Sequence, residues 1–390
     1  MRTFERTHPW LTFRLDLRRA PYTLWLLLGE AQSKAQHVAG TPLLPEVQER
    51  FYQLFLAKGV LATTAIEGNT LTEGEVLRHM AGQLHLPPSK EYLAQEVSNI
   101  LDACNAIGAR MLDGRQASDL REEEVKAFNG LVLRSLPLGE DVVPGVYRTH
   151  SVGVGRYRAA PAEDLDELMR RYCDWLNTGF EGPPSQKMAF GILKAVMAHL
   201  YLAWIHPFGD GNGRTARLIE FQILLASGVP SVAAHLLSNF YNQTRAEYYR
   251  QLDLAHQVGG DPLPFVEYAL QGFVDGLKEQ IATIRHQQLA VHWVNYIHDR
   301  FRDTETKADV RRRRLALDLS QQEGPVPTGR IRYLSPRLAE AFAGKTDKTI
   351  KRDLNQLEEM GLVEQGPGGA RARMEIVLAF LPQVRSEPRR

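Results

Sequence analysis

Apolar side chains recur at intervals of three and four residues through most of the first 300 positions. This spacing places them along one face of a helix, and Pro, Gly, Ser or Asp bound the successive segments. The sequence therefore predicts a mainly α-helical protein. The expected helices cover residues 45–66, 72–82, 90–111, 121–135, 164–176, 185–205, 214–226 and 243–257, with a further long helix after Pro264.

One segment between the fourth and fifth expected helices has a different pattern. In residues 144–161 the helical spacing disappears, and β-branched residues alternate with Gly and Arg. This alternation predicts a short β-hairpin over residues 150–158.

The composition changes again beyond about residue 300. Turn-forming residues between 321 and 329 indicate a linker, and a helix, tight turn, helix and strand are expected from Ser335 onward. That order resembles a winged helix-turn-helix, with the glycine-rich segment 366–373 as the wing. In that interpretation the outward contacts of the second helix come from Thr349, Lys351, Arg352 and Asn355.

The charge of the chain is nearly balanced, with 47 Lys and Arg against 46 Asp and Glu. No overall field therefore directs it to nucleic acid or to a membrane. From residue 331 onward there are 11 basic and 8 acidic residues, a weak basic bias. DNA binding, self-association as a homodimer and docking of a target protein all stay open for this C-terminal module.

Two cysteines, Cys104 and Cys173, lie far apart and without partners at metal-ligand spacing. A disulfide scaffold and a structural zinc site are therefore not expected. The N-terminus lacks the apolar stretch of a secretory signal. No later run approaches the ~20 apolar residues that span a bilayer, and the best candidate, Leu24–Leu28, is far too short. We expect a cytoplasmic protein without membrane contact.

The segment from His206 to Arg217 carries most of the chemistry. Its three glycines let backbone N–H groups approach a ligand, and the following helix adds the positive end of its dipole. Such a loop suits a polyphosphate. Asp210 offers an oxygen that Mg²⁺ prefers, and Arg214 lies one helical turn before Arg217 on the same face. His206 can accept a proton near neutral pH.

Each of these residues alone also has a purely structural interpretation. A single His beside a helix end caps or packs, a Gly-Asn-Gly makes a turn, and two arginines one turn apart form a solvated face. Their joint occurrence within twelve residues favours a nucleotide site.

The pattern His-Pro-Phe-x-Asp-Gly-Asn-Gly-Arg-Thr-x-Arg is the signature of Fic proteins, which this chain resembles throughout this segment. The resemblance implies a helical core that binds ATP with Mg²⁺ and transfers AMP to a Ser, Thr or Tyr hydroxyl of a protein. It implies His206 as the base and Asp210 as the metal ligand. Gly211, Asn212, Gly213, Arg214 and Arg217 would hold the phosphates. Relatives that phosphorylate their targets carry Lys where Gly213 stands, so that variant is disfavoured.

The same resemblance assigns two further parts of the site. The hairpin becomes a flap that pairs with an extended segment of the target. Its contacts would come from Ser151, Val152, Gly153 and Val154. Tyr248 or Tyr249 would flank the adenine, while His256 stands where some relatives carry an Asn that touches the base or ribose. The structural alternative for the hairpin is a surface loop without a partner. For the tyrosines it is ordinary core packing.

An inhibitory pattern lies upstream, where Thr63 is followed four residues later by Glu67 and then Gly68. In relatives with this pattern the glutamate pairs with the second motif arginine, here Arg217, and keeps ATP from its productive pose. The alternative is an ordinary helix C-terminus, at which Gly is favoured. In some relatives the equivalent glutamate positions water for removal of AMP.

The sequence thus predicts a protein adenylyltransferase that acts on another protein or on itself. The alternatives are a nucleotide-sensing transcriptional regulator and a Fic enzyme that removes AMP or uses another nucleotide. The expected division is an N-terminal helical region with the inhibitory helix at 1–115, a Fic core at 116–300, a linker at 301–330 and the winged module at 331–390.

Overall fold

The computed structural model describes residues 2–112, 119–155, 157–257, 259–303 and 306–378. The chain folds into two compact units, unit 1 at Met1–Ile281 and unit 2 at Ala282–Arg390. This boundary falls within the helix Leu263–Arg300 (α12). The predicted boundary between residues 115 and 116 lies outside the described residues.

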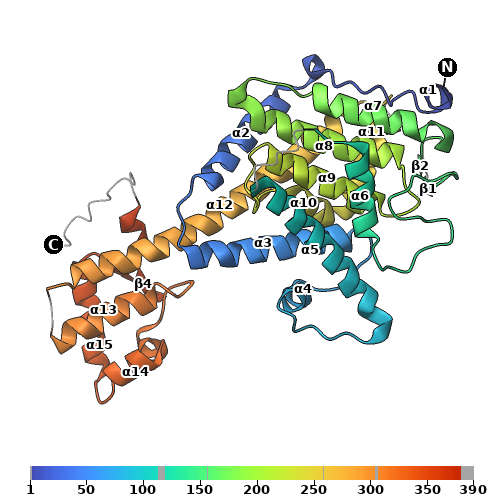
Figure 1. Ribbon diagram of the computed structural model, residues 1–390. Helices are drawn as coiled ribbons and strands as arrows, with labels where there is room; N and C mark the ends of the chain where they lie inside the picture. The colour runs from blue at the N-terminus through green and yellow to red at the C-terminus, as the bar shows by residue number, and fades with distance from the viewer. Residues whose placement is uncertain (1, 113–118, 156, 258, 304–305, 379–390) are drawn as a thin grey trace. The chain divides into compact units, whose positions relative to one another are not determined.

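Unit 1 is built from helices, as predicted (Figure 1). The helix bounds agree with the prediction to within a few residues at most ends, because the apolar spacing that predicts each helix is also what its packing requires. The helices are α1 (Thr3–Thr7), α2 (Tyr22–Ala39), α3 (Pro45–Ala65), α4 (Glu73–Met80), α5 (Glu91–Leu112), α6 (Glu122–Val132), α7 (Leu165–Thr178), α8 (Lys187–Ile205), α9 (Asn212–Ala226), α10 (Leu236–Gln243), α11 (Arg245–Gln257) and the start of α12.

The predicted hairpin is present as the antiparallel pair β1 (Gly153–Val154) and β2 (Tyr157–Arg158). Gly153 lies opposite Arg158 and Val154 opposite Tyr157. Beyond this register, the backbone N–H of Ala159 donates to the carbonyl of Val152 at 3.1 Å. The residues of β1 are exposed, so a face of the hairpin is open to a partner.

The core of unit 1 centres on α8 and α9, which lie side by side among the other helices (Figure 1). Nearly every residue of α8 from Gly191 to Ile205 is buried. The segment Pro184–Ile205 is long and apolar enough to cross a membrane by length and composition alone, and 78% of its most apolar 18-residue stretch is buried inside the protein. The expectation that no apolar run approaches this length was therefore wrong. Its apolar side chains pack against neighbouring helices.

Helix α2 was not predicted, although its apolar stripe is regular. Leu24, Leu28, Ala31, Ala35 and Val38 are its buried residues, at intervals of three and four. The sequence interpretation considered Leu24–Leu28 only as a membrane candidate. This run instead begins an amphipathic helix that packs on α8.

Unit 2 has its own apolar core, in which Trp293, Leu315, Ile331 and Leu354 are fully buried. The elements that follow α12 are α13 (Lys307–Leu319), α14 (Pro336–Ala341), α15 (Asp347–Glu359), β3 (Val363–Gly366) and β4 (Gly369–Ala372). Helix α13 lies inside the range predicted as a linker, and it is helical there because Leu315, Ala316 and Leu319 are buried in this core. The winged helix-turn-helix assignment stays a prediction.

Candidate nucleotide-binding site

The candidate site begins at the junction between α8 and α9. Helix α8 ends where His206 adopts a left-handed backbone with φ of 52°. Its backbone N–H still donates to the carbonyl of Leu202 at 2.8 Å. Gly211, at φ 75°, then turns the chain into α9. A left-handed conformation costs energy for a residue other than Gly, and such strain is often found at functional sites.

The loop between the two helices is held by amide side chains. Asn212 accepts from the backbone N–H of Phe208 at 2.9 Å and donates to its carbonyl at 2.8 Å. Asn129 of α6 donates to the carbonyl of Asp210 at 2.9 Å. Because the amide of Asn212 is used inside the loop, its predicted contact with a nucleotide would come from its backbone. Sequence interpretation missed Asn129, which lies 81 residues before Asp210.

A cavity of about 490 Å³ opens at this loop. The predicted residues His206, Asn212, Gly213, Glu67, Tyr248, Tyr249 and Val154 all line it, together with Gly155, Tyr157, His199, Ala203, Trp204, Ala216, Leu252, Asp253 and His256. The structure therefore brings together part of the motif, Glu67 of the predicted inhibitory pattern, the paired tyrosines and one residue of the predicted flap. The other predicted site residues are not among the lining residues, namely Thr63, Gly68, Ser151, Val152, Gly153, Asp210, Gly211, Arg214 and Arg217.

The backbone of Gly213 lies close to the side chains of Glu67 and Arg217. A Cβ atom at this position would lie 2.2 Å from Oε1 of Glu67 and 3.1 Å from Nη1 of Arg217. Arg217 is almost fully buried. Its Nη2 donates to Glu67 at 2.5 Å and to the carbonyl of Thr63 at 2.9 Å.

Two further nitrogens of Arg217, Nε and Nη1, are buried without a hydrogen-bond partner among the described residues. Buried donors of this kind are rarely left unpaired. An anionic group beside Gly213 would satisfy them, which fits the predicted phosphate contact of this arginine.

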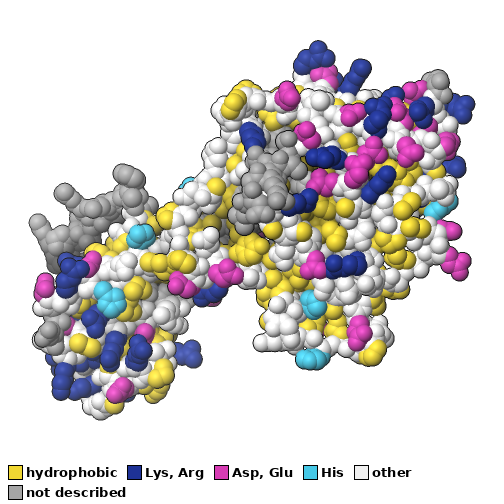
Figure 2. Space-filling view, in the orientation of Figure 1, with side chains coloured by type: hydrophobic (Ala, Val, Ile, Leu, Met, Phe, Trp, Pro, Cys, Tyr) yellow, Lys and Arg dark blue, Asp and Glu magenta, His cyan; other side chains and the backbone are white. Residues whose placement is uncertain are grey.

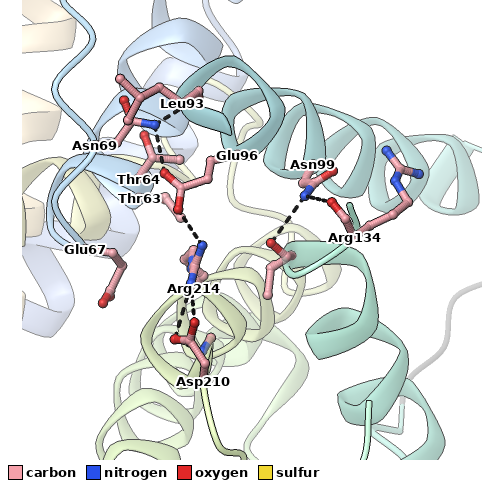
Figure 3. Close-up of polar contacts among 12 residues, drawn as sticks. Thr63, Thr64, Glu67, Asn69, Leu93, Glu96, Asn99, Arg134, Asp210 and Arg214 are labelled. Carbon is pink, nitrogen blue, oxygen red and sulfur yellow. Dashed lines mark hydrogen bonds and ion pairs between the residues drawn. The ribbon is translucent and has the colours of Figure 1, made fainter. Parts of the chain in front are cut away.

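Arg214 is paired with an acid that the sequence interpretation missed. Its Nη1 donates to Glu96 of α5 at 2.8 Å, and its Nη2 lies 3.4 Å from Asp210. Figure 3 shows Glu96 between Arg214 and Asn69, whose amide donates to Glu96 at 2.8 Å. Glu96 therefore fixes the arginine beside the loop. Nothing in the spacing of the sequence places Glu96 next to a residue 118 positions away.

Asp210 is the one motif carboxylate available to a metal. Its side chain is 51% exposed, and Oδ1 accepts from the backbone N–H of Gly211 at 2.5 Å. The described residues contain no group of three or more His, Cys, Asp or Glu that could hold a metal by themselves. Mg²⁺ that binds through substrate phosphates needs only one or two protein carboxylates, so Asp210 fits this kind of site.

The environment of His206 favours its neutral form. Burial, assisted by the positive charge of Arg148, lowers the pKa of His206 to about 4, although Glu67 and Asp210 act in the opposite direction. Burial also favours the neutral form of Glu67, but the Arg217 guanidinium outweighs it and holds the pKa of Glu67 below its usual value. At neutral pH the site therefore contains a free imidazole base and an ionised glutamate.

The two predicted tyrosines occupy different positions. Tyr248 is buried, and its hydroxyl lies 2.8 Å from Nε2 of His199. Tyr249 is 40% exposed, and its hydroxyl donates to the carbonyl of Ile66 at 3.4 Å. Both rings line the cavity, so either can contact a base. His256 also lines it, with its ring centroid 4.8 Å from that of Tyr157 in the flap.

Residues 119–224 match the model of the Fic/DOC family. The matched range includes both the predicted flap and the whole motif.

Its relatives are protein adenylyltransferases by name. The chain is 28% identical over 256 residues to protein adenylyltransferase fic-1 of Caenorhabditis elegans, covering 66% of this chain and 46% of that protein. It is 26% identical over 227 residues to protein adenylyltransferase Fic of Nematostella vectensis, covering 58% and 48%. The chain thus spans about half the length of these curated relatives.

Solved structures share the fold. A Fic family protein from Desulfovibrio desulfuricans superposes with a TM-score of 0.54 at 24% identity, covering 90% of this chain and 95% of that one. A fragment of Fic-1 from C. elegans superposes with a TM-score of 0.54 at 25% identity, covering 67% and 72%.

Proposed function

We propose that this protein is an adenylyltransferase that moves AMP from ATP to a hydroxyl of a protein, either a separate target or the chain itself. The observation that carries the proposal is the placement of a neutral His206 in the same cavity as Gly213. A base and an anion cradle in one cavity suit transfer of a phosphorus group to a hydroxyl.

In the proposed reaction, the target hydroxyl oxygen attacks the α-phosphorus of ATP and forms the new P–O bond. The bond from the α-phosphorus to the oxygen bridging to the β-phosphate breaks, and pyrophosphate leaves. His206 accepts the proton of the hydroxyl. Arg214 and Arg217 hold the β- and γ-phosphates and offset the charge that develops there. Bound at Asp210, Mg²⁺ would supply further positive charge to the phosphates.

The flap gives the target a place to bind. Ser151, Gly153 and Val154 are exposed, so their backbone groups are accessible to an extended chain. Pairing with a strand would deliver a hydroxyl to the cavity that Val154 also lines. We place this reaction in the cytoplasm.

Glu67 restrains the reaction in this proposal. Its carboxylate lies beside Gly213 and pairs with Arg217, so it occupies the place that a γ-phosphate requires. Displacing Glu67 would allow ATP to adopt the reactive pose. The alternative reactions are removal of AMP from a protein and transfer from another nucleotide. Both would use this site, but their substrates and products differ.

Intact-protein mass spectrometry tests the proposal directly. The Glu67→Gly variant is incubated with Mg-ATP, alone and with cell extract as a source of targets. A mass gain of one AMP unit supports adenylyl transfer. A gain of one phosphate, or no gain with any common nucleoside triphosphate, contradicts it.

A second candidate function, DNA binding by unit 2, is favoured by the charges of α15. Lys348, Lys351 and Arg352 are exposed in its first half, while Glu358 and Glu359 are exposed in its second half. The first turn also carries the exposed Asp347, which pairs with Arg332. Basic side chains also gather on this part of unit 2 in Figure 2. The phosphates of DNA would pair with the exposed Lys348, Lys351 and Arg352. Self-association and target docking remain the alternative proposals for unit 2.

Filter binding to duplex DNA at several salt concentrations tests this second function in the full chain. Arg352→Gln should weaken affinity and reduce the salt slope by about 0.9 for each lost phosphate contact. The matched control is Arg302→Gln, which removes a cation whose side chain is 72% exposed. An absence of salt-sensitive affinity in the unchanged protein excludes DNA.

A further inference from the structure

Arg148 is a buried cation whose hydrogen bonds go only to carbonyl groups. It is 4% exposed, and the described residues give it no ion pair. Its Nε donates to the carbonyl of His206 at 2.8 Å, its Nη1 to that of His150 at 2.7 Å, and its Nη2 to that of Ala160 at 2.5 Å. Burying a charge is costly unless its donors are satisfied, so this arrangement needs a reason.

The carbonyl groups that Arg148 contacts belong to two separate parts of the site. His150 and Ala160 bracket the hairpin, while His206 begins the motif loop. The backbone N–H of Arg148 also donates to the carbonyl of Pro207 at 3.0 Å. The planar guanidinium fixes the direction of each donor, so these groups are held in one geometry.

Two further contacts join the hairpin region to the motif loop and to the end of α8. Tyr147 and Phe208 form an isolated antiparallel bridge, which joins the approach to the hairpin to the motif loop. The hydroxyl of Tyr157, in β2, donates to the carbonyl of Trp204 at 2.7 Å. Arg148 lies between Tyr147 and Tyr157 in the sequence and is the only one of the three residues with a charge.

The contact at His206 has a specific consequence for its backbone. His206 has a left-handed backbone conformation, which is unfavourable for a residue that has a side chain. The bond from Arg148 restrains its carbonyl and so helps to hold that conformation. The direction of the imidazole depends on it, because the side chain leaves the same backbone.

We propose that Arg148 is a positioning residue for adenylyl transfer, fixing His206 and both ends of the hairpin in one geometry so that the base faces the hydroxyl of the target. This inference rests on the proposed function. Arg148 does not line the nucleotide cavity, so it acts through His206 and the flap.

The test compares Arg148→Lys and Arg148→Gln, each made in the Glu67→Gly background. Lys keeps the charge and loses the planar fork, while Gln loses both. We expect each variant to lower kcat for AMP transfer by about 100-fold, the scale of a small misplacement of a reacting group, with ATP affinity unchanged. Arg170→Lys and Arg170→Gln, which alter an exposed arginine of α7, are the matched controls.

A second readout is independent of turnover. Histidine NMR titration, with the signal assigned by His206→Ala, follows the pKa of His206 in the absence of nucleotide and Mg²⁺. The charges that act most strongly on this imidazole are those of Arg148, Glu67 and Asp210. Asp253 and His256 also line the cavity that His206 lines. Arg148→Gln should raise the pKa of His206, whereas Arg148→Lys should leave it near that of the unchanged protein.

The outcomes separate the two proposals. A fully active Arg148→Lys variant, or a loss of ATP affinity equal to the loss of kcat, overturns the positioning role. If the Glu67→Gly protein transfers no AMP at all, the proposed function fails. The titration then tests the role of Arg148 by itself, and an unchanged pKa of His206 in Arg148→Gln overturns the inference. Circular dichroism checks folding, and Arg148→Lys decides if the Gln variant does not fold.

Discussion

The carboxylate of Glu67 lies 2.5 Å from Nη2 of Arg217, although 150 positions separate the two residues in the sequence. The contact joins the end of α3 to the second turn of α9. A tethered group of this kind competes with a free ligand at an effective concentration of about millimolar or higher. Under the proposed function, the pair would place an internal competitor at the γ-phosphate position.

Arg217→Ala should be inactive whether or not Glu67 is present. The reason is that one guanidinium serves both the restraint and the substrate, so removing it releases Glu67 but also removes a phosphate contact. Transfer of AMP by Arg217→Ala and by Glu67→Gly/Arg217→Ala is compared with that of Glu67→Gly alone. Activity of the double variant near that of Glu67→Gly would show that Arg217 does not hold the nucleotide.

Asp210→Ala should weaken the binding of Mg-ATP and lower turnover. The variant removes the motif carboxylate that fits Mg²⁺, and the remaining ligands would be phosphate and water oxygens. Calorimetry with Mg-ATP, and with ATP in the presence of a chelator, measures the metal-dependent part of the affinity. Unchanged Mg-ATP affinity together with unchanged turnover would remove Asp210 from the site.

Gly59→Ala should destabilise unit 1, because a Cβ at this position in α3 would lie 2.2 Å from Cγ of His235. The displacement of a packed ring costs about 1–3 kcal/mol in typical overpacked cores. Gly108→Ala in α5 is the matched control, since a Cβ there meets nothing within 4 Å and Ala favours a helix by about 1 kcal/mol. Urea unfolding measures both. Equal stability of the two variants would contradict the tight packing of α3 on His235.

Stability should fall as the pH is lowered from about 6.5 to about 4. Burial lowers the pKa of His235 to about 4, so the unfolded chain takes up a proton in this range that the folded chain does not. Protonation therefore favours unfolding, by on the order of 1–3 kcal/mol at the low end. His235→Gln should flatten this part of the stability profile. An unchanged slope would show that His235 is not the group responsible.

Most of the helices, and the functional segment His206–Arg217, could be predicted from the sequence because both are local patterns. Apolar spacing depends on residues within a turn of each other, and the motif occupies consecutive positions. Helix α13 was missed because its four consecutive arginines, 311–314, obscure the apolar positions. Arg311 and Arg312 both pair with the buried Asp353 of α15, a partner about 40 residues away.

Glu96 and Arg148 could not be predicted for a related reason. Each reaches the motif from a distant element, and neither belongs to a local pattern that distinguishes it from a surface charge. Glu67 was predicted only because the resemblance to Fic proteins connects it with Arg217. Spacing alone fits a helix end equally well, and Gly68 does adopt the positive φ typical of one, at 106°.

The most direct test of AMP transfer and of its restraint by Glu67 is the initial rate at which label from the α-phosphate of ATP enters protein. The unchanged protein, Glu67→Gly and Glu67→Gly/His206→Ala are compared at equal concentration, with folding checked by circular dichroism. Restraint by Glu67 and proton removal by His206 predict faster labelling by Glu67→Gly than by the unchanged protein, and none by the double variant. Equal labelling by the unchanged protein and Glu67→Gly, or continued labelling without His206, would contradict this prediction.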